Sequence, residues 1–378
     1  MTNVSSTSRT SGTTVRAAVW REPRSPLSLE DVWLADPASG EVGVRVAATA
    51  ICGSDLAYVD GHWESPSPAV FGHEAAGTVD RIGPGVTDLA VGDRVVVTLI
   101  RSCGSCRKCR AGAPVGCSGR FALDERGPLR DAYGSEIWQG LGVAAFAEAV
   151  TVHRSQVFRV GPGIDLDVAA LLSCAVLTGV GAVRNTARVA AGSFVVVLGA
   201  GGVGLNVVQG ARLAGAAEVI AVDPDQRRLD AALRFGASAT VAVGEDVPEE
   251  VRAMTKGEMA DYVFVATAAV SAIETGLGLL ARMGTLVLVG MPRSGARVSL
   301  DPVTVASTGR RILGSKMGSA KPARDIPALV ALYGEGRLEL DGLITARYAL
   351  SEIEEALGSL RSGDALRNVI ITDESLIA

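Results

Sequence analysis

The sequence predicts an α/β protein in which a β-rich, barrel-like domain precedes a domain built on a doubly wound parallel sheet. Short β-runs and Gly/Pro turns fill the chain from Val15 to about Val97, without helical segments between them. From Ser193 onward, apolar runs rich in Val and Ile alternate with helical stretches, as in a sheet that is buried on both faces. A length of 378 residues also favours two domains over one.

We expect residues 15–178 and 322–378 to form the β-rich domain and residues 179–321 to form the parallel-sheet domain. The last segment is helical and strand-like again, and we place it with the first domain. Residues 1–14 are rich in Ser and Thr and have no apolar centre of a signal peptide, so we expect a disordered tail.

The composition excludes several classes of function. A hydrophobic fraction of 48% with 20% charged residues is typical of a chain that buries large cores. The formal net charge of -5 gives no attraction to nucleic acid or anionic lipid, and no apolar run reaches the roughly 20 residues that span a bilayer. Without an export signal we expect a cytoplasmic protein, in which clustered thiols bind metal rather than form disulfides.

A glycine-rich turn follows the apolar run SFVVVL and precedes a helical segment. It fills the G-x-G-x-x-G pattern, which permits a tight turn, close approach of a pyrophosphate and close packing of helix on strand. The N–H groups that open the helix bind phosphate. In this context the motif predicts a Rossmann dinucleotide site. The expected contacts are Gly199, Gly201, Gly202, Val203 and Gly204.

Asp223 ends the next predicted strand, where a carboxylate binds the adenosine ribose hydroxyls and repels a 2′-phosphate. This residue favours NAD over NADP. Arg227 and Arg228 lie close by and would tolerate a phosphate. The alternative interpretation is a glycine turn with a purely structural aspartate.

Four of the six cysteines form a tight C-x2-C-x2-C-x7-C cluster, made of Cys103, Cys106, Cys109 and Cys117. Four thiolates at this spacing suit a closed tetrahedral zinc site with a structural role, and an iron–sulfur cluster is the main alternative. We expect the metal to organise a lobe over residues 101–120.

Cys52 and Cys174 stand far from that cluster and from each other. Together with His73 they would provide three ligands and leave a fourth position free, which is the arrangement of a catalytic zinc. A lone histidine beside a glycine is otherwise more often a packed or turn residue than a ligand.

The stretch GHEAAGTVDRIGPGV resembles the signature of the zinc-dependent alcohol dehydrogenases, in the medium-chain dehydrogenase/reductase superfamily. The matching positions are Gly72, His73, Glu74, Gly77, Gly83 and Val86. The resemblance extends from about Val15 to Asp373 and includes the cysteine cluster and the glycine motif. It implies a GroES-like catalytic domain, a Rossmann coenzyme domain, NAD as cofactor and two zinc ions per subunit.

The resemblance also implies roles for residues of the metal sites. Cys52, His73 and Cys174 match the catalytic zinc ligands, and the four clustered cysteines match the structural zinc ligands. Glu74 matches an acidic residue that approaches the metal when water or substrate exchanges. Asp55 matches a carboxylate that holds the ligand histidine, in line with the need to orient such a ligand.

Further matches concern the cofactor and the proton. Thr178 falls where the family packs a residue behind the nicotinamide ring, Arg367 where a cation meets the pyrophosphate, and Arg228 near the adenosine ribose. Ser54 matches the hydroxyl that takes the alcohol proton toward the ribose and solvent. A helix cap is the alternative role of this serine.

Two positions depart from the family pattern. Ala57 stands where many members end the proton relay on a histidine, and Gly53 stands where some members place an arginine near the pyrophosphate. His62 is near in sequence, but we expect it on an exposed loop. These departures bear on rate and pH dependence, not on the reaction class.

By the same resemblance, the substrate channel is lined by large apolar residues without paired charges. These residues are Trp63, Leu99, Leu141 and Met291. Such a pocket favours an apolar alcohol, because burying polar groups without partners is costly. Without the resemblance these residues would be assigned to the core.

Together these features predict a zinc- and NAD-dependent oxidoreductase that transfers hydride between a primary or secondary alcohol and NAD+, giving an aldehyde or ketone. The alternative enzyme oxidises an S-hydroxymethyl adduct of formaldehyde with a small thiol, whose carboxylates Arg120, Arg126 and Arg130 would hold. From another class, a zinc-free reductase relative or a nucleotide-binding protein without turnover usually lacks the catalytic zinc ligands.

The chain resembles the longer members of the family, which are typically dimers paired through edge strands of their nucleotide domains. We therefore expect a homodimer, with residues 281–301 supplying such an edge. The other expected partner is a small alcohol or carbonyl substrate, without nucleic acid or membrane.

Overall fold

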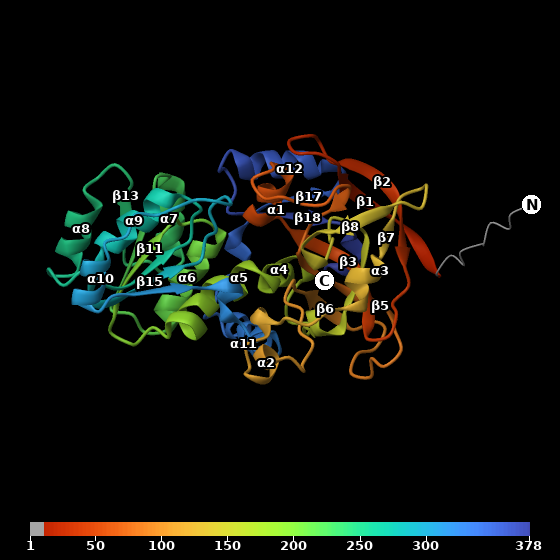
Figure 1. The fold of residues 1–378 in the computed structure, drawn as a ribbon, viewed down its shortest axis with the longest axis horizontal. Coiled ribbons are helices and arrows are strands. Elements are labelled where there is room, and N and C mark those ends of the chain that lie inside the picture. Colours follow the sequence, from red (N-terminus) through yellow and green to blue (C-terminus); the bar gives the residue numbers. More distant parts are fainter. Residues whose placement is uncertain (1–10) are drawn as a thin grey trace, which may run out of the picture.

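The computed structural model describes residues 11–378. These residues form two lobes that lie side by side in Figure 1, a β-rich lobe on the right and a lobe of sheet and helices on the left. The predicted fold class is confirmed, because one lobe contains a small closed barrel and the other an all-parallel sheet. The predicted boundaries, residues 15–178 with 322–378 and residues 179–321, stay a proposal.

The barrel closes in the strand order β1-β2-β7-β8-β4. The bounds of its strands are β1 (Gly12–Trp20), β2 (Ser28–Ala35), β4 (Ala69–Val70), β7 (Leu129–Arg130) and β8 (Glu136–Gln139). In β1, Val15 and Ala17 are buried while Arg16 between them is exposed, as the period of two in a strand requires.

Strand β1 begins inside the segment that was predicted as a disordered tail. Residues 1–10 of that prediction lie outside the described residues. For Gly12 to Thr14 the prediction is wrong, because Thr13 and Thr14 already pair with Leu34 and Trp33 of β2. Their Ser/Thr-rich composition hid the strand, since ladder hydrogen bonds use the backbone.

A second sheet has the order β10-β6-β5-β3-β18-β17, and β9 also pairs with β3. Its strands are β3 (Glu41–Ala50), β5 (Glu74–Ile82), β6 (Arg94–Val97), β9 (Ala149–His153), β10 (Val157–Arg159), β17 (Ile344–Ala349) and β18 (Arg367–Ile371). The C-terminal segment returns to this sheet through β18. In the centre of this sheet, Ala50 of β3 pairs with Glu74 of β5 on one side and with Val369 of β18 on the other. Three distant parts of the chain are therefore neighbours at this position.

The parallel sheet has the order β13-β12-β11-β14-β15-β16. Its strands are β11 (Phe194–Leu198), β12 (Glu218–Asp223), β13 (Ala239–Ala242), β14 (Ala260–Val265), β15 (Leu280–Leu288) and β16 (Arg311–Gly314). The helices that alternate with them are α6 (Gly202–Leu213), α7 (Gln226–Arg234), α8 (Val247–Met254), α9 (Val270–Gly278) and α10 (Pro302–Thr308). The strand order reverses at β11, and ligands of such sheets bind beside the carboxyl end of the strand at that point.

The predicted sheet edge is wrong in its position. Residues 281–301 contain most of β15, but β15 lies between β14 and β16, so β16 forms that edge. The run of only four residues in β16 is short, and the arginine that opens it obscures an apolar strand pattern.

Helices α4 (Leu166–Ala170) and α5 (Ala175–Gly181) lie between the two lobes in Figure 1. The other helices are α1 (Gly53–Val59), α2 (Arg107–Arg110), α3 (Ala122–Arg126), α11 (Pro322–Gly334) and α12 (Ile353–Arg361). No single helix within residues 11–378 is long and apolar enough to cross a membrane, and one bent pair, Leu166–Ser173 with Ala175–Ala187, qualifies by length and composition alone.

Candidate active site and metal centres

Four buried side chains converge where the second sheet meets α5. Cys52, His73, Glu74 and Cys174 each offer one ligand atom, and these atoms lie within 4.8 Å of one another. Cys52 follows β3, His73 and Glu74 stand at the start of β5, and Cys174 precedes α5. The structure therefore brings together all four residues that the sequence predicted at the catalytic metal.

Asp55 fixes the orientation of His73. Its Oδ1 lies 3.1 Å from Nδ1 of His73 and accepts the N–H of Gly72, while its Oδ2 accepts the N–H of Cys52 at 3.0 Å. Both side chains are fully buried. With Nδ1 donating to Asp55, Nε2 carries the lone pair, and this buried atom has no hydrogen-bond partner.

The charges of this cluster depend on one another. A hydrogen bond from the Cys174 thiol lowers the pKa of Cys52 well below its usual value, and the same bond raises the pKa of Cys174. Burial disfavours a charged His73, but Asp55 and Cys52 together outweigh burial and raise the pKa of His73. Burial also raises the pKa of Glu74 to about 8, although Arg367 opposes this shift.

This donor set fits zinc. Two sulfurs and one imidazole nitrogen are typical ligands of a catalytic site, and a fourth position stays available for water or substrate. Nε2 of His73 and Oε2 of Glu74 are both buried without a partner, which is costly unless a cation satisfies them. Asp55 behind the histidine supplies the carboxylate that such ligands usually have.

Arg367 connects this cluster with the glycine-rich turn. Its Nη1 donates to Oε1 of Glu74 and to the carbonyl of Ile51, each at 3.1 Å. A Cβ atom placed on Gly202 would come within 2.2 Å of Nε of Arg367. The guanidinium therefore lies directly against the first turn of α6, where the sequence predicted a pyrophosphate contact.

The glycine-rich turn has the geometry that its sequence predicted. Gly199 follows β11 with a φ of +96°, and a Cβ on Gly204 would come within 1.8 Å of the carbonyl oxygen of Gly199. Gly201 caps α6 and has nothing within 4 Å of the place where a Cβ would sit. Half-buried Val203 follows in the first turn. The open space at Gly201, beside unpaired N–H groups of a helix, fits a pyrophosphate.

Asp223 ends β12 and is buried. Its two carboxylate oxygens accept the N–H groups of Ala200 at 2.8 Å and Asp225 at 3.0 Å. Arg227 is occupied by ion pairs with Asp225 and Asp364. Arg228 donates to the carbonyl of Gly363.

Met317 is a site residue that the sequence did not reveal. Its Sδ lies 3.7 Å from both Sγ of Cys174 and Oγ1 of Thr178. It belongs to the turn Lys316–Ser319, which follows β16. A single methionine between a short strand and a helix gives no periodic signal, so only the tertiary fold shows its place.

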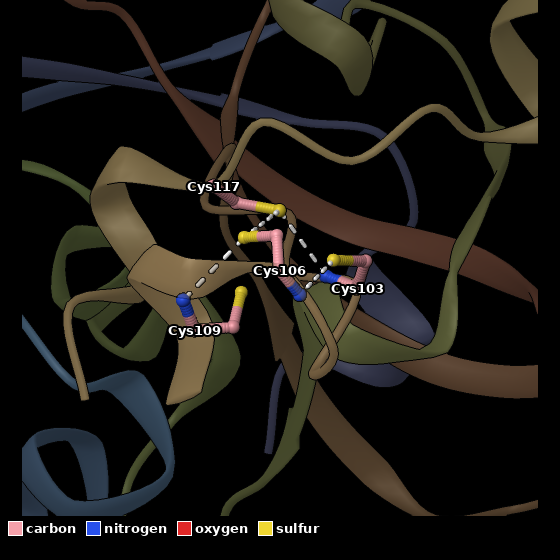
Figure 2. A group of neighbouring side chains, drawn as sticks. All are labelled: Cys103, Cys106, Cys109 and Cys117. Atoms are coloured by element: carbon pink, nitrogen blue, oxygen red, sulfur yellow. Dashed lines mark hydrogen bonds between the residues drawn. The ribbon is translucent and has the colours of Figure 1, made fainter. Parts of the chain in front are cut away.

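The four clustered cysteines form a second candidate metal site. Figure 2 shows their side chains turned toward one another, and their sulfurs lie within 4.8 Å of one another. Backbone N–H groups of Ser118 and Cys109 hold the pKa of Cys106 down to about 5, which favours the thiolate that binds metal. All six cysteines are free thiols. Four soft ligands without an open position fit a structural zinc.

The predicted substrate residues divide into two pairs. Leu99 and Leu141 line a cavity of about 240 Å³, but Trp63 and Met291 do not. Nε1 of Trp63 donates instead to the carbonyl of Pro292, and Met291 is exposed.

The lining of the cavity also contains charged residues, which the sequence did not predict. The lining of this cavity includes Arg101 and Asp124, which form an ion pair, and Lys316. These residues lie far apart in the sequence, so no local pattern could have placed them together.

The structure decides one local alternative, the role of Ser54 as a helix cap. Cys52, not Ser54, occupies the N-cap of α1, so the helix-cap interpretation of Ser54 is wrong. His62 is exposed in the loop after α1, as expected, and Ala57 lies within α1.

Two of the three arginines proposed to hold a thiol substrate are already engaged. Arg126 pairs with Glu41, and Arg130 donates to the carbonyls of Leu129 and Arg126. Arg120 is exposed.

Comparison with known proteins places this geometry in a family. Residues 38–162 match the model of an alcohol dehydrogenase GroES-like domain, and residues 202–335 match that of a zinc-binding dehydrogenase. The chain is 35% identical over 366 residues to an NDMA-dependent alcohol dehydrogenase of Amycolatopsis methanolica, covering 94% of this chain and 98% of the relative. The chain belongs to the zinc-dependent alcohol dehydrogenase family.

Other members of the family are similar along nearly the whole chain. A class-3 alcohol dehydrogenase of Oryza sativa subsp. japonica is 34% identical, with 96% of this chain and 97% of the relative covered. An alcohol dehydrogenase zinc-binding domain protein from Burkholderia ambifaria superposes with a TM-score of 0.90 at 35% identity, covering 96% and 99% of the two chains.

Two further solved structures extend this comparison. Benzyl alcohol dehydrogenase from Acinetobacter calcoaceticus superposes with a TM-score of 0.89 at 31% identity, covering 95% and 99% of the two chains. A zinc-binding dehydrogenase from Sinorhizobium meliloti 1021, bound to NADP, has a TM-score of 0.81 at 28% identity, covering 95% and 100%. This chain is thus a zinc-dependent alcohol dehydrogenase with two candidate zinc sites and a nicotinamide cofactor.

Proposed function

We propose that this alcohol dehydrogenase transfers hydride between a primary or secondary alcohol and NAD+, giving an aldehyde or a ketone. The observation that carries the proposal is the buried cluster of Cys52, His73 and Cys174, with an unpartnered Nε2 on the histidine. Arg367 lies against both this cluster and the dinucleotide turn, so oxygen activation and hydride acceptance would occur side by side.

The chain's own residues prepare the site for this reaction. Cys52, His73 and Cys174 would hold a zinc ion, which would supply a Lewis acid for the alcohol oxygen, and bound NAD+ would supply the hydride acceptor. Asp55 holds the imidazole in one tautomer and orientation. Arg367 donates a hydrogen bond to Glu74 beside the cluster, and this contact holds the guanidinium in place for the pyrophosphate.

The proton follows a shorter route than in many members of the family. Ser54 is half-buried in the first turn of α1 and provides the hydroxyl for the first transfer. Because Ala57 offers no proton acceptor, we propose that water takes the proton from there.

We propose NAD rather than NADP as the cofactor. Asp223 is fixed at the end of β12, where its negative charge would repel a 2′-phosphate. Arg227 is paired with two aspartates and has little charge left to receive a phosphate. Comparing kcat/KM for the two cofactors tests this, and a clear preference for NADP would contradict it.

The alternative substrate is an S-hydroxymethyl adduct of formaldehyde with a small thiol. The similarity to class-3 alcohol dehydrogenases, at 34–36% identity, keeps this alternative open. The engagement of Arg126 and Arg130 within the fold counts against it. Formation of NADH from formaldehyde only when a thiol is present would favour the adduct.

We also propose a homodimer. The edge strand β16 and a group of exposed apolar side chains within it or before it in the sequence support this arrangement. Those side chains are Met291, Val298, Leu300, Val303 and Ile312.

The central experiment follows NADH absorbance with a panel of primary and secondary alcohols, using protein whose zinc content has been measured. We expect turnover only in protein that carries two zinc ions per subunit. Zinc-loaded protein that oxidises none of the alcohols would contradict the proposed activity.

A further inference from the structure

The cavity of about 240 Å³ combines apolar walls with fixed charge. Leu99, Leu141, Pro114 and Val115 contribute apolar surface. A pocket of this kind takes small organic molecules and uses its few polar groups to select among them.

The cavity lies next to the candidate catalytic metal centre. Lys316 in its wall directly precedes Met317, whose sulfur lies 3.7 Å from Sγ of Cys174. Cys52, His73 and Cys174 do not line the cavity themselves, so the turn Lys316–Ser319 is what connects the two sites.

The turn that carries Lys316 is held firmly in place. Met317, Gly318 and Ser319 all have positive φ values, of 48°, 62° and 48°. The hydroxyl of Thr186 contacts Oγ of Ser315 at 2.9 Å and Oγ of Ser319 at 2.8 Å, on either side of the turn. Strained backbone that is fixed in this way is concentrated at functional sites.

Of the charges around the cavity, only Lys316 lacks a partner among residues 11–378. Arg101 is satisfied, because it pairs with Asp124 and donates to Oε1 of Gln156 and the carbonyl of Gly142. Lys316 forms no ion pair with any of the described residues. The cavity therefore has one uncompensated positive charge.

We propose that this cavity receives the far end of the substrate and that Lys316 selects an alcohol or aldehyde that carries a carboxylate there. The inference rests on the proposed alcohol dehydrogenase activity and specifies its substrate class. A carboxylate would form a charge-assisted hydrogen bond with the ammonium group, whereas a neutral alcohol would leave that group unpaired. The rest of the substrate would pack against the leucines.

The alternative role of Lys316 is to stabilise the cysteine lobe. Cys117 and Gly119 also line the cavity, and zinc with four thiolates carries a net negative charge that an ammonium group would balance. In that case Lys316 would stabilise the lobe and would not discriminate between substrates. The two roles differ in what a substitution changes.

The test compares para-(hydroxymethyl)benzoate with para-methylbenzyl alcohol, which is similar in size but neutral. Zinc-loaded Lys316→Met, Lys316→Arg and wild-type protein are assayed with both alcohols and NAD+. We expect the ratio of kcat/KM, carboxylate over neutral, to fall roughly 10- to 100-fold in Lys316→Met and to be retained in Lys316→Arg. Lys256→Met, which removes an exposed lysine after α8, is the matched control and should keep the wild-type ratio.

An unchanged ratio in Lys316→Met would overturn the proposal, and so would a loss of lobe zinc or of thermal stability without a change in the ratio. Calorimetry of the binding of both alcohols to zinc-loaded protein distinguishes failure of this pocket proposal from failure of the proposed alcohol oxidation. Selective binding of the carboxylate that disappears in Lys316→Met, without any NADH formation, would support the pocket and contradict the proposed oxidation.

Discussion

His73 shows how a few contacts can prepare a metal ligand. Asp55 accepts from Nδ1 and also binds the backbone N–H groups of Gly72 and Cys52, so ring and ligand loops are fixed together. The free Nε2 then faces the sulfurs of Cys52 and Cys174. Asp55 is therefore a positioning residue, and its loss should weaken zinc binding by roughly 10- to 100-fold.

Cys174→Ala should remove one zinc and all turnover while the fold survives. Only Cys52 and His73 would remain as strong ligands, and a small alanine fits at a helix start. Zinc analysis should give one ion per subunit, and circular dichroism should match the wild type. Two retained zinc ions, or substantial activity, would contradict the assignment of Cys174 as a ligand.

In the turn between β11 and α6, one glycine is required for packing and another leaves space for the cofactor. Gly204 has the carbonyl oxygen of Gly199 within 1.8 Å of any added Cβ, so Gly204→Ala should push α6 from the sheet and lower the Tm. Gly201 faces open space, so Gly201→Ala should keep the Tm and weaken cofactor binding by occupying the pyrophosphate position. Thermal unfolding and NADH titration of both variants check this difference. Equal loss of stability in the two would contradict it.

The cysteine lobe depends on metal for its stability. Its helix α2 spans only Arg107–Arg110, and none of its residues is buried. Cys106→Ala should therefore lower the Tm. A loss of about 2 kcal/mol in the free energy of unfolding corresponds to a fall in Tm of roughly 4–8 °C for a domain of about 150–250 residues. Calorimetry with and without a chelator measures this. A chelator that strips one zinc without changing the Tm would argue against a structural role.

At the scale of the whole molecule, the features that the sequence predicted are those encoded within short segments. The glycine motif and the C-x2-C-x2-C-x7-C spacing lie within short segments, and alternating Val-rich runs gave the fold class. The strand register at Ala50 then brings Cys52, His73 and Arg367 together, which no local pattern encodes. The resemblance to a family supplied that juxtaposition in advance.

The features that the sequence missed are products of tertiary packing. Met317 and Lys316 reach the site from a turn after an inconspicuous strand, and Arg101 reaches the cavity from the other lobe. The edge strand β16 is short and begins with arginine, so the apolar run in β15 attracted the prediction instead. Substrate specificity and assembly therefore could not be predicted from the sequence, whereas the reaction class could.

The assembly prediction follows from the edge of the parallel sheet. Strand β16 leaves one side of its backbone unpaired within the described residues, and an unpaired edge is a template for a second chain. Leu300 and Val303, near this edge in the sequence, are 46% and 72% exposed. A symmetric dimer would bury the same patch on both copies.

Light scattering should therefore give the mass of a dimer for the wild type and of a monomer for Val303→Glu, because a buried carboxylate without a partner disfavours the interface. Val243→Glu is the matched control. Val243 is 59% exposed and follows β13, at the opposite edge of the same sheet, so its substitution should leave the dimer intact. A wild-type monomer or tetramer, or equal dissociation by both variants, would show that β16 does not organise the assembly.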